Sequence, residues 1–198
     1  MGSPGLRERK RIETRRALSS AALELVLECG LDDVTVEQIA AAADVAPRTF
    51  FNYFSSKHEA LVGLGPEAIE DTADALRARP PDEGARDALF AVLAGDTNSS
   101  DVLRRYKQRS ELVRRYPELI PRYLETGVLL ERALSGALAE RLGFDDAVDP
   151  YPRAAAAVAT SLVRTTLSWW REHGADDAHL VDTIKELFDT FIPEASAS

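Results

Sequence analysis

The stretch of sequence that decides the fold is VTVEQIAAAADVAPRTFFNYFSSK, residues 34 to 57. Its Thr35 and Gln38 have the Thr-x-x-Gln spacing of a capping box, in which each side chain bonds a free backbone amide near the other. We therefore predict a short helix that begins at Val36. Its alanine-rich side lets a second helix approach closely, and the apolar run stops at Asp44. The stretch thus predicts two short crossed helices joined by a tight turn.

A second helix is predicted over residues 48 to 54, directly after Pro47, whose fixed φ suits the first turn of a helix. Phe50 and Phe54 are four residues apart and therefore share the side that packs inward. The other side chains point outward, and they are Arg48, Thr49, Asn52, Tyr53 and, at the edge, Phe51. Arginine, threonine and asparagine can bond base edges or phosphates, so this side of the helix fits the major groove of DNA.

The alternative is an ordinary helical hairpin whose aromatic residues all belong to the core. Phe50 and Phe54 fit that interpretation, because aromatic residues at helical spacing are usually buried. The outward set cannot lie on the same side of one helix as this pair. The pattern therefore favours a helix that reads DNA.

These residues resemble the TetR family of bacterial transcriptional regulators over about residues 10 to 62. The resemblance is carried by Thr35, Ile39, Ala40, Val45, Thr49, Phe50, Phe51, Tyr53, Phe54, Lys57 and Leu61. It implies that Arg48, Thr49, Asn52 and Tyr53 enter the major groove, while Thr35, Lys57 and Arg15 contact phosphates. It further implies a repressor that binds a palindromic operator as a homodimer and is released by a small molecule.

One residue departs from the family pattern. Where the family usually has Leu-Tyr, this chain has Phe50 and Phe51. Phe51 lacks the hydroxyl that often bonds a phosphate from that position. We expect an apolar contact instead, to a thymine methyl group or a sugar.

The net charge of −9 at first argues against a DNA-binding protein. The first sixty residues, however, carry eight Lys or Arg and nine Asp or Glu, whereas the remaining residues carry sixteen and twenty-four. The acidic excess therefore lies mostly outside the DNA-binding part. Basic residues gather before the first core helix, and they are Arg7, Arg9, Lys10, Arg11, Arg15 and Arg16. We predict a flexible basic arm over residues 1 to 10 that reaches phosphates, although a solubilising tail would have the same composition.

The single cysteine, Cys29, excludes an intrachain disulfide and fits the reducing cytoplasm. Cys29 is predicted to pack as a small hydrophobic residue; a redox sensor is the alternative. The longest stretch poor in charge, residues 154 to 170, contains Arg164 and is shorter than a membrane span, so no membrane contact is expected.

The whole chain is predicted to be all-α, with about nine helices, because its apolar residues recur every three or four positions. After a basic arm or tag at residues 1 to 10, we predict a three-helix helix-turn-helix DNA-binding domain at 11 to 62. Residues 63 to 198 are predicted to form a helical domain for effector binding and dimerisation.

The resemblance implies that the last two long helices pair with those of a second subunit. The expected interface residues are Ala155, Val158, Ala159, Leu162, Thr166, Trp170, Ile184 and Phe188. Small residues at the start of this stripe suit close approach of helices. Burial inside one chain explains the same pattern equally well.

A ligand pocket in the C-terminal domain is also implied by the resemblance. Its candidate residues combine aromatic bodies with polar or charged tips, and they are Tyr106, Arg109, Tyr123, Arg164 and Trp169. A solvated face or the core would use the same residue types. No class of effector follows from them.

Two other classes of function are alternatives to a regulator. An enzyme is disfavoured, because the three histidines are far apart in sequence and no glycine-rich phosphate loop occurs. Neither a cofactor nor a metal is therefore expected. A helical module that binds lipid or protein without touching DNA is the remaining alternative.

Overall fold

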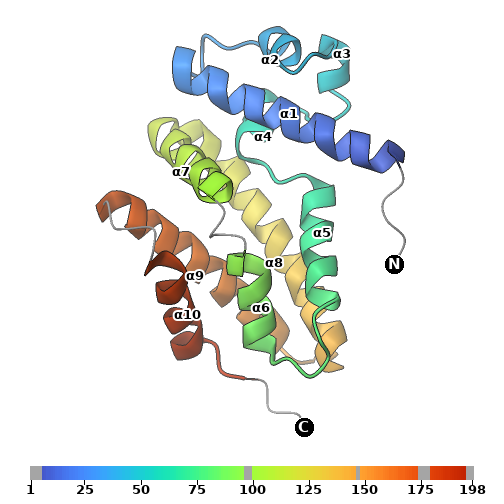
Figure 1. Cartoon of the computed structure of the whole chain (residues 1–198), viewed down its shortest axis with the longest axis vertical. Coiled ribbons are helices and arrows are strands. Elements are labelled where there is room, and N and C mark those ends of the chain that lie inside the picture. The colour runs from blue at the N-terminus through green and yellow to red at the C-terminus, as the bar shows by residue number, and fades with distance from the viewer. Residues whose placement is uncertain (1–5, 96–99, 146–147, 174–178, 195–198) are drawn as a thin grey trace. The chain divides into compact units, whose positions relative to one another are not determined.

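The computed structural model describes residues 6–95, 100–145, 148–173 and 179–194, and for 6–8 and 100–107 it describes the backbone alone. Every regular element of these ranges is a helix, which confirms the all-α class (Figure 1). The elements are α1 (Leu6–Cys29), α2 (Val36–Ala42), α3 (Pro47–Phe50), α4 (Lys57–Val62), α5 (Pro66–Arg77), α6 (Ala85–Ala94), α7 (Ser100–Arg115), the 3-10 helix η2 (Pro117–Leu119), α8 (Ile120–Leu142), α9 (Tyr151–His173) and α10 (Leu180–Phe191). None of these helices is long and apolar enough to cross a membrane.

The chain divides into two compact units. Unit 1 comprises residues 1–67 and 108–126, and unit 2 comprises residues 68–107 and 127–198. The division differs from a single boundary near residue 63, because the end of α7, the 3-10 helix and the start of α8 pack with the N-terminal helices. Helices α7 and α8 therefore each contribute to both units.

Unit 1 is held by one apolar core. Phe50, Ile39 and Leu61 from the N-terminal helices are fully buried, and so are Leu112 of α7 and Leu119 of the 3-10 helix. Burying a side chain of this size contributes about 1.5–3 kcal/mol to folding. The two later residues are thus as much part of this core as the helix-turn-helix itself.

Helix α1 starts earlier than the sequence analysis expected. Residues 6 to 10 belong to the helix, so the prediction of a flexible arm is wrong for them. The helix ends at Cys29 and is followed by Gly30 with φ +95°, a conformation that glycine adopts without a Cβ clash. Cys29 is exposed rather than packed, because the last turn of α1 carries it out of the core.

The turn between α2 and α3 is a Schellman motif. The amide of Val45 bonds the carbonyl of Ala40 at 3.0 Å, and the amide of Asp44 bonds that of Ala41 at 3.1 Å. Asp44 has φ 54°, the left-handed conformation that usually falls to glycine at this position. The turn ends α2 and aims α3 across it, as the sequence predicts.

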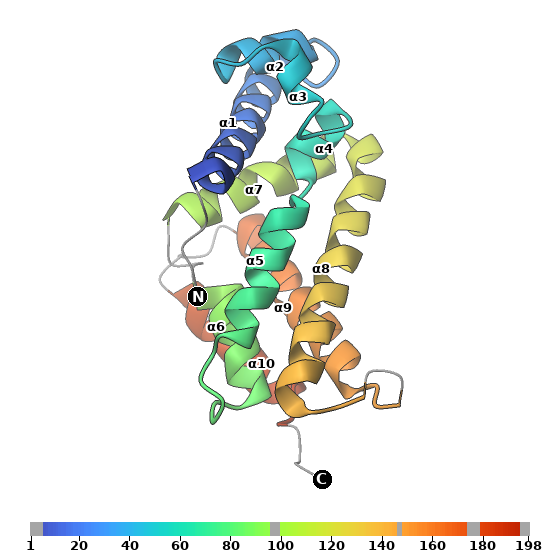
Figure 2. The same ribbon diagram turned by 90° about the vertical axis from the view of Figure 1, so that its right-hand side faces the viewer.

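Unit 2 is a helical bundle in which α9 packs against α6 and α10, and α10 also contacts α6 (Figure 2). The residues expected at a dimer interface lie in its interior. Ala155, Ala159, Thr166, Trp170, Ile184 and Phe188 are buried, and Val158 and Leu162 are half-buried against the same cluster. The interface prediction is therefore wrong for the six buried residues, and for the half-buried Val158 and Leu162 it stays a prediction. Burial within the chain accounts for the spacing of the six.

Candidate DNA-reading surface

The predicted recognition helix is shorter than expected. Helix α3 ends at Phe50, and residues 51 to 53 form turns. The amides of Asn52 and Tyr53 bond the carbonyls three residues before them, at 3.1 and 2.9 Å, so the chain tightens into a 3-10-like turn. The same side chains are still presented in sequence, by four helical residues and the turn that follows.

The inward pair is confirmed. Phe50 is 0 % exposed and Phe54 is 2 % exposed. Their ring centroids lie 5.6 Å apart in a tilted arrangement. These two rings anchor α3 to the core of unit 1 and thereby fix which of its side chains face outward.

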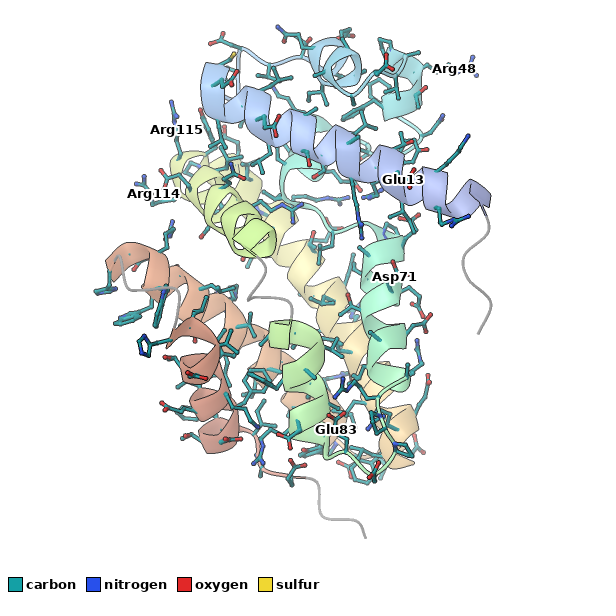
Figure 3. The ribbon with its side chains drawn as sticks, viewed as in Figure 1. Glu13, Arg48, Asp71, Glu83, Arg114 and Arg115 are labelled. Atoms are coloured by element: carbon teal, nitrogen blue, oxygen red, sulfur yellow. The ribbon has the colours of Figure 1, made fainter. Side chains whose placement is uncertain are left out.

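The side chains of the outward set differ in how far they are exposed to solvent. Arg48 and Asn52 are exposed, and Figure 3 shows Arg48 pointing away from α3. Phe51 is 61 % exposed, although its ring also meets that of Phe50 edge-on at 5.5 Å. Thr49 is half-buried, and Tyr53 is half-buried against the core. One short segment thus carries a cation, an amide, an apolar ring and two hydroxyls.

Thr35 caps α2 as predicted. Its side-chain oxygen accepts from the Gln38 amide at 3.2 Å, and the Gln38 side chain accepts from the Thr35 amide at 2.8 Å. Thr35 is exposed. Since the cap uses only a lone pair of the hydroxyl, its hydrogen stays available for a phosphate.

Arg15 has a structural position instead of the expected phosphate contact. Its guanidinium donates to the carbonyl of Tyr53 at 2.5 Å and lies 4.2 Å from the centroid of the Phe54 ring. Its side chain is only 14 % exposed. Burial, together with the charges of Arg11 and Arg122, holds the pKa of Arg15 below its ordinary value although Glu59 opposes this. The sequence could not reveal this role, because the partners lie about forty residues away.

Glu59 of α4 bonds several groups of unit 1, including two arginines. It accepts from the amide and the hydroxyl of Ser55, both at 2.7 Å, and pairs with Arg122 of α8 at 2.8 Å and with Arg15 at 3.7 Å. Burial alone would raise the pKa of Glu59. The Ser55 hydrogen bonds and the Arg122 charge outweigh burial and hold the pKa below its ordinary value. Sequence reasoning missed Glu59 and Arg122.

Lys57 is also committed within unit 1. Its ammonium donates to the carbonyls of Leu31 and Val34, at 2.6 and 3.1 Å. The hydroxyl of Tyr116 accepts from the Leu31 amide at 3.2 Å. Lys57 and Tyr116 therefore hold the loop between α1 and α2, and the expected phosphate contact of Lys57 would have to rely on its one remaining donor hydrogen.

Other cations near the start of α1 stay accessible. Arg9, Lys10 and Arg16 are exposed. Arg11 forms an ion pair with Glu67. The basic character expected of the arm is thus present, but on a helix.

The candidate ligand residues are divided between the two units. Arg109 and Tyr123 belong to unit 1, where Arg109 donates to Ser19 at 3.3 Å and Tyr123 packs against the core. Arg164 and Trp169 are exposed on α9 of unit 2, and Trp169 stacks on His173 at 4.5 Å. The side chain of Tyr106 lies outside the described residues. Exposed positions on α9 account for Arg164 and Trp169 without a pocket.

Two hollows in the described part of the chain are lined by residues other than these candidates. One of about 390 Å³ lies over α1 and the end of α2, with Glu24, Glu28 and Asp44 among its lining residues. Another of about 370 Å³ lies over α8 and α9, beside Arg132 and Arg153. Across the described ranges, no three His, Cys, Asp or Glu side chains are placed to hold a metal ion.

Comparison with known proteins gives the family. The model of bacterial regulatory proteins of the tetR family matches residues 18–62, and that of the MftR C-terminal domain matches residues 80–194. The chain is 35 % identical over 204 residues to the transcriptional regulator TcmR of Streptomyces glaucescens, covering 98 % of this chain and 89 % of that protein. It is 33 % identical over 112 residues to the putative mycofactocin biosynthesis regulator MftR of Mycobacterium tuberculosis, covering 56 % and 57 %.

Solved structures agree on the fold. A TetR-family regulator from Rhodococcus superposes with a TM-score of 0.61 at 21 % identity, covering 92 % of this chain and all of that one. The fatty acid degradation regulator FadR of Bacillus halodurans superposes with a TM-score of 0.58 at 19 % identity, covering 98 % and 100 %. The chain belongs to the TetR family of helix-turn-helix transcriptional regulators, and it is a regulator rather than an enzyme.

Proposed function

We propose that this regulator represses transcription by binding a palindromic operator as a homodimer, and that a small molecule bound by unit 2 releases it. The DNA-binding part of the proposal rests on how the side chains of α3 and its turn are divided between the core and the solvent. Phe50 and Phe54 are buried, which leaves Arg48, Phe51 and Asn52 exposed together.

The side chains have distinct roles in this proposal. Arg48 and Asn52 bond base edges, and Phe51 contacts a thymine methyl group. Thr35, Thr49 and Tyr53 offer hydroxyls to phosphates or bases. Because Arg15 and Lys57 form bonds inside unit 1, we assign the neutralisation of phosphates to the exposed cations Arg9, Lys10 and Arg16.

A homodimer is required by the size of the reading surface. One short segment reads few base pairs, whereas two copies about 34–36 Å apart read both halves of a palindrome. Since six of the eight residues first expected at the interface are buried, we expect the contact to use more exposed positions of α9 and α10. Phe191, 57 % exposed at the end of α10, is the apolar residue we assign to it.

Release by a ligand needs only a modest difference in affinity. A ligand that binds a dimer with wrongly spaced reading segments a few kcal/mol more tightly than the DNA-bound form shifts the population away from DNA. Repression follows from operator binding over a promoter.

Gel-shift and footprinting experiments on the DNA flanking the gene test the proposal. We expect a palindromic footprint, affinity that falls steeply with salt, and a weaker shift for Arg48→Ala. A chain that binds no DNA better than a scrambled fragment would instead be a helical binding module. Sedimentation of the parent and of Phe191→Ser tests the dimer, and a monomeric parent at micromolar concentration would contradict it.

A further inference from the structure

Among the described residues of unit 2, four side-chain atoms are buried without a hydrogen-bond partner, and they are Nε of Arg86, Nε of Arg171, the hydroxyl oxygen of Thr166 and the indole nitrogen of Trp170. Arg86 and Arg171 form ion pairs, whereas Thr166 and Trp170 each have no other polar side-chain atom to bond with. Thr166 is 5 % exposed and Trp170 is 6 % exposed, so both side chains are shielded from bulk solvent. Buried polar groups are nearly always paired, and each exception calls for an explanation.

The Thr166 hydroxyl is unusual even among the helical threonines of this chain. The usual helical threonine satisfies its hydroxyl on the carbonyl four residues earlier. Six threonines do so at 2.7 to 3.0 Å, namely Thr14, Thr72, Thr126, Thr160, Thr183 and Thr190. Thr166 does not make that bond, although α9 provides the same opportunity.

The two atoms belong to the same side of α9. Thr166 and Trp170 are four residues apart, and residues at this spacing are neighbours on a helix surface. Trp170 belongs to the core cluster of unit 2, whose fully buried members are all apolar. Half-buried apolar side chains of α6, among them Phe90 and Leu93, pack against that cluster. The two hydrogen-bond donors thus belong to the buried side of α9, and the apolar cluster of unit 2 includes half-buried side chains at its edge.

We propose that Thr166 and Trp170 are the paired donors for one oxygen atom of an effector, and that this effector is an uncharged, largely apolar molecule with a carbonyl group. A carbonyl oxygen has two lone pairs and can accept from both groups at once. A carboxylate fits less well, because a charge buried among apolar residues needs a cationic partner. Ketones, lactones and quinones have the required chemistry. The inference rests on the ligand response proposed above and names the chemistry of its site.

Calorimetric titration of the full chain with three matched probes tests this pair. The probes are 2-octanone, octanoate and octylammonium, which share an aliphatic chain and differ in the polar end. We expect 2-octanone to bind and the two ions to bind at least about tenfold more weakly. Tighter binding of octanoate than of 2-octanone would overturn the proposal, and so would the absence of binding by all three probes.

Variants separate the donors from the surrounding packing. Thr166→Val keeps the shape and removes the hydroxyl, and Trp170→Phe removes the indole nitrogen. Each should weaken 2-octanone binding about tenfold, the usual effect of one lost buried hydrogen bond. Thr165→Val, at the exposed neighbouring position, is the matched control and should bind the probe like the parent. Equal binding by Thr166→Val and the parent would overturn the proposal.

Thermal unfolding without probe provides an independent readout. Thr166→Val should melt no lower than the parent, because it removes a buried group that bonds nothing. A clearly lower melting temperature for Thr166→Val would show that the hydroxyl has an internal partner and would also overturn the proposal. Gel shifts of the parent without probe are scored separately, so failure to bind DNA would count against the proposed function and leave the probe titration standing.

Discussion

The guanidinium of Arg15 donates to the carbonyl of Tyr53 at 2.5 Å, and so joins the first helix to the end of the reading turn. The bond is charge-assisted and largely shielded from water, since the side chain of Arg15 is 14 % exposed. Such bonds contribute about 1.5–3 kcal/mol. The shape of the proposed DNA-reading surface therefore depends on a residue that is itself largely buried.

Replacing Arg15 should reduce stability first. Arg15→Met keeps an unbranched stem over Phe54 and loses the bond to the carbonyl, so we expect the free energy of unfolding to fall by about 1.5–3 kcal/mol in urea titrations. Arg16→Met, at the exposed neighbouring position, is the control and should change stability by less than about 0.5 kcal/mol. If Arg15→Met kept the parent stability and only weakened DNA binding, the internal role of Arg15 would be refuted.

Lys57 offers a test of the loop it holds. Lys57→Met removes both bonds to the carbonyls of Leu31 and Val34 and should lower the free energy of unfolding by about 1–3 kcal/mol. Because two carbonyls of unit 1 hold the ammonium in place, we expect Lys57 to neutralise no phosphate, and the salt dependence of DNA binding should barely change. Lys10→Met should do the opposite, leaving stability intact and reducing the salt slope by about one. Reversed results for the two lysines would restore the phosphate contact first expected of Lys57.

Glu59 makes the stability of unit 1 depend on pH. Its pKa is lowered in the folded chain, so its stabilising effect is fully present above the unfolded pKa of about 4.3 and is lost as pH falls through the folded value. Glu59→Gln should therefore be less stable than the parent at pH 7, and the difference should shrink steadily below about pH 4. Denaturant titrations from pH 7 to 3 measure this. A difference that stayed constant with pH would show that the charge of Glu59 has no part in it.

The reading surface should separate specificity from general affinity. Arg48→Ala should cost about 1–3 kcal/mol on the operator and relax the preference at one base pair. Phe51→Tyr should gain affinity for all sequences alike, because it restores a hydroxyl that can bond a phosphate. Competition gel shifts with single-base operator variants measure both effects. An unchanged sequence preference in Arg48→Ala would remove this residue from the base contacts.

Asp44 occupies a backbone conformation that favours glycine. Asp44→Gly should raise the melting temperature, because φ 54° costs a residue with a Cβ about 1 kcal/mol. Asp44→Val should lower it, since a branched side chain tolerates this region less than aspartate does. Equal melting temperatures for the two variants would show that the turn relaxes to suit either residue.

The helix-turn-helix was predictable because its signals are local. The Thr35 cap, the break at Asp44 and the burial of Phe50 and Phe54 each depend on residues a few positions apart. Regular apolar spacing likewise sufficed for the all-α class.

The uses of Arg15 and Lys57 were not predictable, because their partners are backbone carbonyls of distant turns, and every residue type offers that acceptor. The prediction that Ala155 and Trp170 lie at a dimer interface was wrong for another reason. Small and apolar residues at helical spacing look the same whether a helix packs against its own chain or against a second one. Periodicity identifies a buried face and leaves its partner open.

Because unit 1 is built from two separate segments of the chain, it cannot be transferred to another protein as one N-terminal piece. Leu112 and Leu119 complete its core from beyond residue 107. A fragment cut after residue 67 would leave unfilled apolar space beneath α1 and α4 and should aggregate. Grafting unit 1 onto a foreign effector domain thus requires three splice points, whereas a purely N-terminal module would need only one.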